Sequence, residues 1–393
     1  MFCDTTIRPA CQISECCDDL DFVTLQAPRR DKHIDSRTDD ALTAASLQTP
    51  IRGKTILQRI KFTLSETKTR RARVLLAALV STLLLGGTFG PTVASAAPER
   101  AVSPMHSAPW GGYDELWVPS SMGNIKVQVQ WAARGGNAAL YLLDGLRARN
   151  DSNAWSFETN AFDQYRNDNI TLVMPVGGES SFYTDWYAPS NFNAQPITYK
   201  WETFLTQELP SFLAGYGVSP TNNAIVGLSM GGSAALNLAG HHRDQFKFAG
   251  SLSGYINISG PGMREAIRLA MLDAGRYNVD SMWGPPWSSG WIRNDPFVNA
   301  ELLRGLPMYI SASNGIPGPY EQPSAPIEYW NTATGMGLEL LALVHARSFE
   351  LRLNSLGIPA TYSFPSSGIH SWANWSAELW MARGQILDTM NAW

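Results

Sequence analysis

The sequence beyond residue 97 predicts an α/β fold in which a mostly parallel central sheet has helices on both faces. Strand-like and helix-like segments alternate along this part of the chain, as they do when helices connect neighbouring parallel strands. Two of the strand-like segments, 138–143 and 170–174, are continuous apolar runs, which is typical of strands buried on both faces. No internal repeat or low-complexity linker interrupts the alternation, so we expect one domain over residues 98–393.

The other strands and the helices are expected from the spacing of apolar residues. Residues 125–131 alternate with a period of two, which indicates an early, half-exposed strand. Residues 201–213 have the apolar spacing of an amphipathic helix. A short strand at 224–226 precedes a small-residue helix at 233–239. Further strands are expected at 246–252, 308–310 and 361–364, and further helices at 262–274, 337–354 and 371–390.

The first hundred residues differ in composition from the rest. All fourteen Trp and all thirteen Tyr lie beyond residue 109, and all four Cys lie before residue 18. A folded domain needs large apolar side chains to offset chain entropy. We therefore expect residues 1–68 to be an N-terminal extension, either unstructured or the result of a mis-called start, and we assign it no function.

Residues 69–97 have the organisation of a secretory signal peptide. A basic segment at 69–73 precedes an apolar run at 74–90, and small residues in an A-x-A pattern follow. The alternative is a membrane-spanning helix, but the run is at the short limit for spanning and holds three Gly. We expect cleavage after Ala96 or Ala97, a secreted or cell-envelope location, and no stable membrane span afterwards.

The expected mature chain has no cysteine and an acidic charge balance. Without cysteine, neither a disulfide nor a thiol nucleophile is available to it. Its 17 Lys and Arg against 24 Asp and Glu give a net charge of about −7. This balance argues against nucleic acid or an anionic membrane as partner. No metal or organic cofactor is implied.

The segment Gly227-Leu-Ser-Met-Gly231 matches G-x-S-x-G, the nucleophile turn of α/β-hydrolases. It lies between an apolar strand and a small-residue helix, where a sharp turn pushes the serine oxygen out above the sheet. The helix N-terminus behind it favours developing negative charge. A chance glycine-rich turn is the alternative, and the flanking strand and helix disfavour it. We therefore expect an α/β-hydrolase fold with Ser229 as the nucleophile.

A serine nucleophile needs a base, and few histidines qualify. In this fold the base follows the nucleophile and the acid in the chain. His241 and His242 lie at the end of the helix behind the serine, and His345 falls within a long helical stretch. His370 follows a strand and a loop at the carboxyl edge of the sheet, where catalytic loops gather. We therefore prefer His370, with His345 as the alternative.

The acid and the oxyanion hole are less constrained. We expect the amide of Met230, directly after the nucleophile, and the amide of Leu146, in the loop after 138–143, to bind the oxyanion. Asp144 and Arg147 would then stand at the mouth of the site, unless they form only an ion pair within the loop. Either carboxylate type can orient a histidine. The residues alone leave four candidate acids open: Glu321, Glu328, Glu339 and Glu350.

A series of further motifs runs through residues 112–390. They are Tyr141–Ala148 with Trp155, Val173–Gly178, Ser181–Tyr187, Tyr199–Leu205, Gly227–Met230, Phe248–Gly254, Met282–Pro285, Asn294–Pro296, Phe364–Pro365 and Gly368–Trp372. In this order the series resembles the antigen-85-type mycolyltransferases, whereas G-x-S-x-G alone is shared by many α/β-hydrolases.

The resemblance implies an exported catalytic domain of the α/β-hydrolase fold. Its expected activity is transfer of a mycolyl chain from trehalose monomycolate to trehalose or to cell-wall arabinogalactan. Matched by position, the family pattern also selects Glu339 among the four acids. The implied residues are Ser229, Glu339 and His370 for catalysis, Leu146 and Met230 for the oxyanion, and Asp144, Arg147 and Trp372 for trehalose.

Some positions depart from the family pattern. Paired cysteines of some members are replaced by 191–197, and Ala312 stands near the position of another cysteine. Glu158 stands where members often have Asn near the sugar, and 162–169 matches the segment tied to fibronectin adhesion poorly. Two other functions are open. One is a secreted carboxylesterase of the same fold, and the other is a non-catalytic envelope-binding or adhesion protein.

Overall fold

The computed structural model describes residues 108–319 and 321–393, which all belong to the unit Thr92–Trp393. The expectations for 1–68 and for the signal peptide at 69–97 lie outside the described residues. Within the described part of the chain, no helix is both long and apolar enough to cross a membrane.

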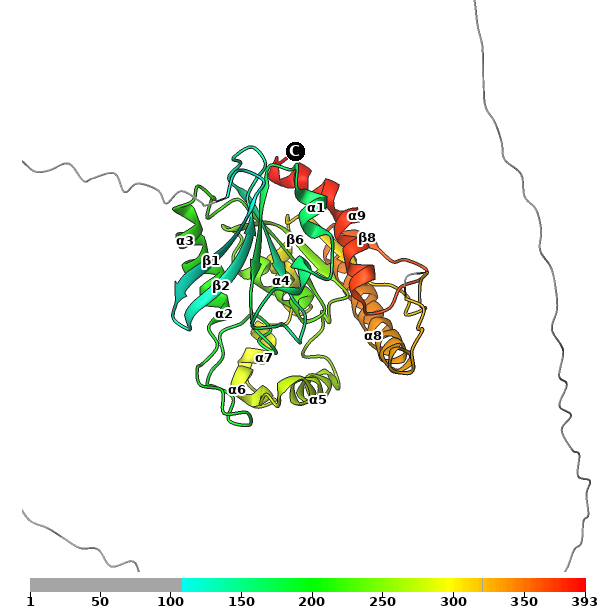
Figure 1. Ribbon diagram of the computed structural model, residues 1–393. Helices are drawn as coiled ribbons and strands as arrows, with labels where there is room; N and C mark the ends of the chain where they lie inside the picture. The colour runs from blue at the N-terminus through cyan, green and yellow to red at the C-terminus, as the bar shows by residue number, and fades with distance from the viewer. Residues whose placement is uncertain (1–107, 320) are drawn as a thin grey trace, which may run out of the picture. The chain divides into compact units, whose positions relative to one another are not determined.

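An eight-stranded sheet lies at the centre of the described residues (Figure 1). Its strand order is β1-β2-β4-β3-β5-β6-β7-β8. The pairs β1–β2 and β2–β4 are antiparallel, and all other neighbours are parallel. The predicted mostly parallel sheet is therefore confirmed. The strands are Tyr113–Ser120 (β1), Gly123–Gln130 (β2), Ala138–Leu143 (β3), Ile170–Pro175 (β4), Asn223–Leu228 (β5), Phe246–Leu252 (β6), Met308–Ser311 (β7) and Thr361–Ser363 (β8).

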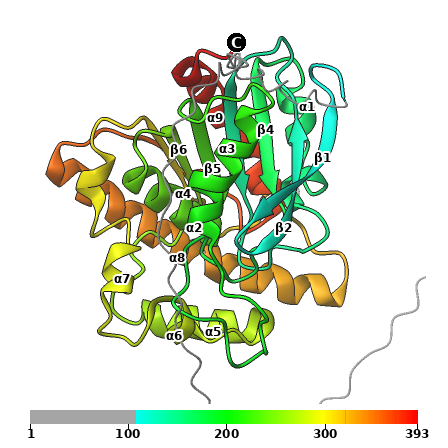
Figure 2. The same ribbon diagram turned by 90° about the vertical axis from the view of Figure 1, so that its left-hand side faces the viewer.

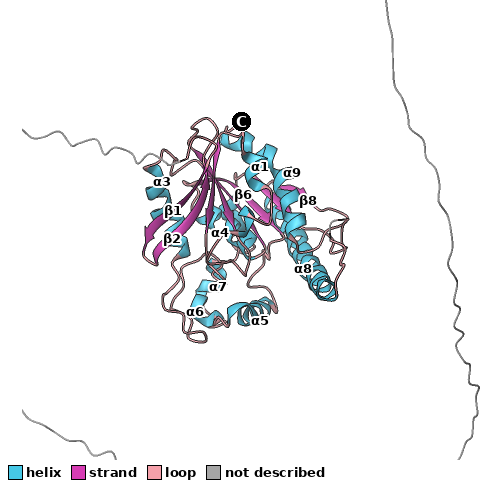
Figure 3. Cartoon of the chain, in the orientation of Figure 1, coloured by secondary structure: helices cyan, strands magenta, loops and turns pink. Residues whose placement is uncertain are grey.

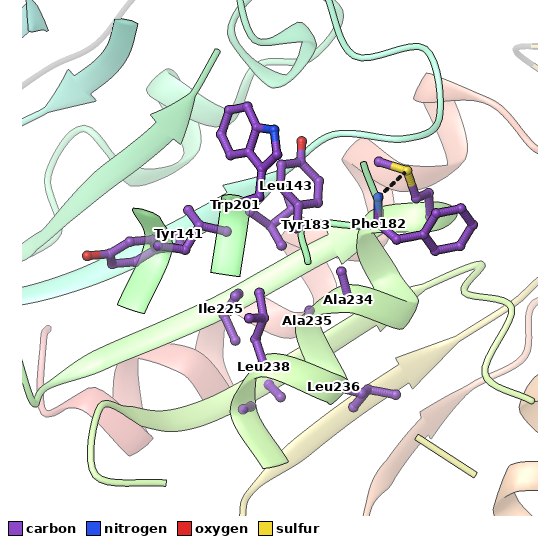
Figure 4. Close-up of a cluster of buried hydrophobic side chains, with 14 of the residues drawn as sticks. Tyr141, Leu143, Phe182, Tyr183, Trp201, Ile225, Ala234, Ala235, Leu236 and Leu238 are labelled. Atoms are coloured by element: carbon purple, nitrogen blue, oxygen red, sulfur yellow. Dashed lines mark hydrogen bonds between the residues drawn. The ribbon is translucent and has the colours of Figure 1, made fainter. Parts of the chain in front are cut away.

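Helices cover both faces of the sheet, as predicted (Figure 3). Successive side chains of β3 enter two different buried clusters, with Tyr141 and Leu143 in one and Leu140 and Leu142 in the other. Helices α4 and α8 contribute to the first cluster, part of which Figure 4 shows, and α1 and α9 contribute to the second. The helices are α1 (Ala161–Tyr165), α2 (Trp201–Thr203), α3 (Leu209–Ala214), α4 (Met230–His241), α5 (Met263–Gly275), α6 (Val279–Trp283), α7 (Ser289–Arg293), α8 (Pro326–Leu356) and α9 (Trp372–Met390).

The three helices α5, α6 and α7 lie together beyond the carboxyl ends of the parallel strands (Figure 2). They come from one continuous stretch between β6 and β7. The N-terminal half of α8 lies near α5 in the same region (Figures 1 and 2). Because ligands of such sheets bind outside the carboxyl ends of the strands, these helices are placed to wall a substrate site.

The sequence reasoning missed β1 and the short helices α1, α6 and α7, and it placed the start of α8 too late. In β1 the buried Asp114 accepts a hydrogen bond from the Trp131 indole, whereas Trp117 is exposed, so the apolar pattern does not mark the inner face. Helix α8 begins at Pro326 rather than at 337. The sequence did not reveal this start, because the first turns of the helix expose Trp330 and have no one-sided apolar pattern. The expected helix at 201–213 contains a π-helical turn between α2 and α3.

Candidate active site

Ser229 occupies the sharp turn between β5 and α4. Its backbone angles, φ 52° and ψ −120°, are strained for a residue with a side chain. Glycine is required on both sides: a Cβ on Gly227 would lie 2.2 Å from the Gly231 carbonyl oxygen, and one on Gly231 would lie 2.4 Å from that of Asp144. The strand, turn and helix around the G-x-S-x-G motif are therefore arranged as a nucleophile elbow requires.

His370 lies in the loop between β8 and α9, and its side chain contacts Glu339 of α8. The His370 Nδ1 is 2.9 Å from the Glu339 Oε2. Both side chains are buried, that of Glu339 completely. With Nδ1–H donated to the carboxylate, the other ring nitrogen is left free to take a proton, as a general base does.

Three donors hold the second carboxylate oxygen of Glu339. Its Oε1 accepts hydrogen bonds from the Ser253 hydroxyl at 2.9 Å and the Ser313 amide at 2.7 Å. The Asn374 side-chain amide donates to the same oxygen at 3.4 Å. A buried carboxylate is stable only when such donors replace its lost water. The sequence reasoning did not single out these three residues, because short polar side chains in loops have no distinctive pattern.

Trp375 links the support of the carboxylate to the imidazole. Its indole N–H donates to the Ser253 hydroxyl at 3.0 Å. The edge of its ring also packs against His370, with centroids 4.9 Å apart and planes at 89°. The Tyr255 ring lies 5.8 Å from His370. The imidazole is thus fixed by one hydrogen bond and by aromatic contacts.

The competing histidines have other partners. The His345 Nδ1 accepts a hydrogen bond from the backbone N–H of Asn257, and burial lowers the pKa of this histidine. His241 contacts the Arg293 carbonyl oxygen, and His242 contacts Glu202. None of the three lines the pocket that contains Ser229.

The other three candidate acids do not contact the His370 ring. Glu321 accepts hydrogen bonds from the Ile369 amide and the Ser371 hydroxyl, beside His370 in the chain. Glu328 accepts from Ser324 at the start of α8, and Glu350 pairs with Arg347. The structure therefore brings only Glu339, of the four, onto the imidazole.

Ser229 and His370 line one pocket of about 580 Å³. Part of its lining is apolar and comes from α5 and α8, including Ile267 and Leu338. Another part is more polar and includes Glu158 and Arg149. An ester with a long acyl chain on one side and a hydroxylated group on the other matches this division. No hydrogen bond joins the Ser229 hydroxyl to His370 in the described residues, and such contacts often tighten only when substrate binds.

Leu146 and Met230 line the same pocket beside Ser229. Within residues 108–319 and 321–393, the amide N–H of neither residue donates a hydrogen bond to the protein. The Leu146 carbonyl oxygen accepts from the Ser180 amide at 2.9 Å, and the Met230 sulfur accepts from the Phe182 amide (Figure 4). These contacts hold both segments in place and leave two amides available for an oxyanion.

The three residues expected to contact trehalose also line the pocket. Asp144 is almost completely buried, and its Oδ2 accepts from the Ala154 amide, whereas its Oδ1 has no partner in the described residues. Burial raises the pKa of Asp144 to about 7. Arg147 pairs with Asp273 of α5, so the alternative of an ion pair with Asp144 is wrong. The Trp372 ring packs edge-on against Trp155 and Trp375.

The fold and the elbow place the chain among the α/β-hydrolases. It matches the Esterase family over residues 119–386. The fluorophosphonate-binding serine hydrolase FphF of Staphylococcus aureus has the same fold, with a TM-score of 0.52, 14% identity, and coverage of 70% of this chain and 98% of that one.

Curated relatives define the family more closely. The chain is 41% identical over 319 residues to the diacylglycerol acyltransferase/mycolyltransferase Ag85C of Mycobacterium leprae, covering 80% of this chain and 91% of the relative. It is 42% identical over 316 residues to Ag85B of Mycolicibacterium smegmatis, covering 78% and 93%. The crystal structure of Mycobacterium tuberculosis MPT51 (FbpC1) matches with a TM-score of 0.61 and 32% identity, over 71% of this chain and 99% of that one. The chain belongs to the antigen 85 family of acyltransferases/mycolyltransferases.

Proposed function

We propose that this protein is a serine-dependent acyltransferase that moves a mycolyl chain from trehalose monomycolate to a sugar hydroxyl. The observation that supports this most is that Ser229 and His370 line one pocket with apolar and polar parts, and that His370 contacts the buried Glu339. The names of the curated relatives give the acyl group its identity.

The first half of the reaction forms an acyl-enzyme. The Ser229 hydroxyl attacks the ester carbonyl while His370 takes its proton, and Glu339 stabilises the imidazolium that results. The amides of Leu146 and Met230 donate to the oxyanion, and each such donor typically contributes about 3 kcal/mol to the transition state. His370 then returns the proton to the departing trehalose oxygen.

In the second half, a sugar hydroxyl replaces water as the nucleophile. His370 takes the hydroxyl proton as the sugar oxygen attacks the acyl carbon. It gives that proton to the Ser229 oxygen as the bond between this oxygen and the acyl carbon breaks. Because water is far more concentrated, transfer requires a bound sugar whose hydroxyl is held in line. We assign three groups to this sugar: the Arg147 guanidinium, the Trp372 ring, and the Oδ1 of Asp144, which has no partner within residues 108–319 and 321–393.

We further propose that cell-wall arabinogalactan is an acceptor and that the enzyme acts after export, with residues 69–97 as its signal peptide and residues 98–393 as its catalytic domain. The signal-like organisation of residues 69–97 supports export. The described residues contain no group of three or more His, Cys, Asp or Glu arranged to hold a metal ion.

The test is to incubate the purified protein with trehalose monomycolate and to analyse the lipids by mass spectrometry. Trehalose dimycolate is the expected product, and the Ser229→Ala variant should form none. Free mycolic acid without dimycolate would instead establish the carboxylesterase. Equal activity of wild type and Ser229→Ala would remove the enzyme assignment and favour the non-catalytic alternative.

A further inference from the structure

A second cleft lies between α1 and α9, on the polar side of the Ser229 pocket. Its volume is about 740 Å³, and its lining includes Glu158, Asn160, Asp163, Gln164, Ser376 and Trp380. Figure 1 shows α1 and α9 side by side. The Gln164 amide donates to the Ser376 carbonyl oxygen at 3.1 Å, and the Ser376 hydroxyl donates to Asn160 at 3.0 Å. These bonds fix the two walls relative to each other.

The lining has the chemistry of a site for uncharged, hydroxyl-rich molecules. The Trp380 side chain is 52% exposed and offers ring surface to the apolar face of a sugar. The carboxylates of Glu158 and Asp163 can only accept hydrogen bonds when ionised. A hydroxyl group is a donor that satisfies both.

The charge of the cleft lining disfavours anionic ligands. Two acidic residues line it, and none of its lining residues is Lys or Arg. Because Arg166 pairs with Asp163, the carboxylate of Glu158 is the lining group that repels a phosphate or uronate most. Arg383 lies beside the cleft, where it stacks on the Trp380 ring and pairs with Asp168. The fit is therefore to a neutral glycan rather than to a nucleic acid, a phospholipid headgroup or an acidic polysaccharide.

The cleft is continuous with the Ser229 pocket. Glu158 lines both, and Ala373 of the cleft directly follows Trp372 of the pocket. The apolar residues that α5 and α8 contribute to the pocket do not line the cleft. A glycan with one hydroxyl at Ser229 can therefore extend along α9 without crossing the region that fits the acyl chain.

From this continuity we infer that the α1/α9 cleft binds the flanking sugar units of an extended, neutral polysaccharide acceptor. The inference rests on the proposed transferase function and adds a subsite to it. A disaccharide acceptor such as trehalose needs only the polar part of the Ser229 pocket. A polymer gains contacts in the cleft, so the cleft favours polysaccharide over disaccharide.

The test compares two acceptors with two cleft variants. Trp380→Ala removes the exposed ring, and Ala377→Gln places a longer side chain in the cleft from an exposed position on α9. Trp287→Ala is the matched control, because Trp287 is 84% exposed and lines neither cavity. The acceptors are trehalose and a neutral oligosaccharide of arabinofuranose and galactofuranose units.

We expect Trp380→Ala and Ala377→Gln to raise KM for the oligosaccharide about tenfold, equivalent to about 1.4 kcal/mol of lost binding. Transfer to trehalose should stay as in wild type, and Trp287→Ala should change neither. Equal losses with both acceptors, or no loss with either, would overturn the inference.

Direct binding separates this inference from the proposed function. The Ser229→Ala variant is titrated with the oligosaccharide and followed by saturation-transfer NMR, and the Ser229→Ala/Trp380→Ala double variant is titrated in parallel. Weaker binding by the double variant supports the cleft even if wild type transfers no acyl group. Equal binding by the two proteins contradicts the cleft even if transfer to trehalose is observed.

Discussion

Replacing Glu339 by Gln should inactivate the enzyme while leaving its shape unchanged, because of where the new amide must point. Three donors, from Ser253, Ser313 and Asn374, converge on the Oε1 position. An NH₂ group placed there would face donors and forfeit hydrogen bonds that are each worth about 1–3 kcal/mol. The amide oxygen therefore takes this position, and the NH₂ group faces His370.

This orientation reverses the tautomer of His370. The Nδ1, now 2.9 Å from an N–H donor, must accept, so the ring proton moves to Nε2. A histidine protonated on Nε2 cannot take the proton of the Ser229 hydroxyl. The corresponding change in other serine enzymes lowers kcat by about 10⁴, or about 5.5 kcal/mol in the barrier. We expect a loss of this order in Glu339→Gln.

The measurement is the rate of acyl-enzyme formation with a chromogenic ester, together with thermal unfolding to show that the variant is folded. Glu350→Gln is the control, since Glu350 lies on the same helix and pairs with Arg347 at the surface. Activity of Glu339→Gln within tenfold of wild type would refute the reasoning. So would a larger loss in Glu321→Gln, because Glu321 lies beside His370 through Ile369 and Ser371.

Three further predictions concern stability. Ser229→Gly should raise the free energy of unfolding by about 1 kcal/mol by relieving the strain at φ 52°, whereas Ser229→Ala should leave it unchanged, as urea denaturation would show. Gly384→Ala in α9, where a Cβ meets nothing within 4 Å, should raise the free energy of unfolding by about 0.5–1 kcal/mol. Gly231→Ala should instead prevent folding or activity, because its Cβ would clash with the Asp144 carbonyl oxygen. Equal melting temperatures for these two variants would contradict both expectations. Burial raises the pKa of Asp144 from 3.8 to about 7, so its contribution to stability is complete below pH 4 and is lost as the pH rises to 7. Asp144→Asn should therefore be more stable than wild type above pH 7, by up to about 4 kcal/mol, and equal to it at pH 4, as denaturation at the two pH values would test.

The parts of the fold that sequence could predict are those where burial is uniform. β3 and β6 begin and end where expected, because every residue of β3 and nearly all of β6 are buried and turns bound both. β1 escaped prediction because its exposed side includes Trp117 and its buried side includes Asp114. The early start of α8 could not be predicted, because the apolar residues of its first turns are exposed and so do not show the spacing of a buried helix face.

For the site, the sequence distinguishes residues with unusual local demands. Ser229 is marked by the glycines that its turn requires, and His370 by its place after β8. The choice of Glu339 depends on which side of α8 meets the ends of β6 and β7, which is a property of tertiary packing. The family pattern supplied this choice, and the contact with His370 agrees with it.

The strand order has a consequence for how the protein folds. Ser229 follows β5, whereas His370 follows β8. Between them in the sheet, β6, β7 and β8 lie in this order beside β5, and each pairs in parallel with its neighbour. Parallel pairing joins distant parts of the chain and is intrinsically slow. During refolding, helical circular dichroism should therefore recover before esterase activity, and activity should appear only when the last strand has joined. The recovery of activity therefore measures when the pairing of β8 with the sheet is complete.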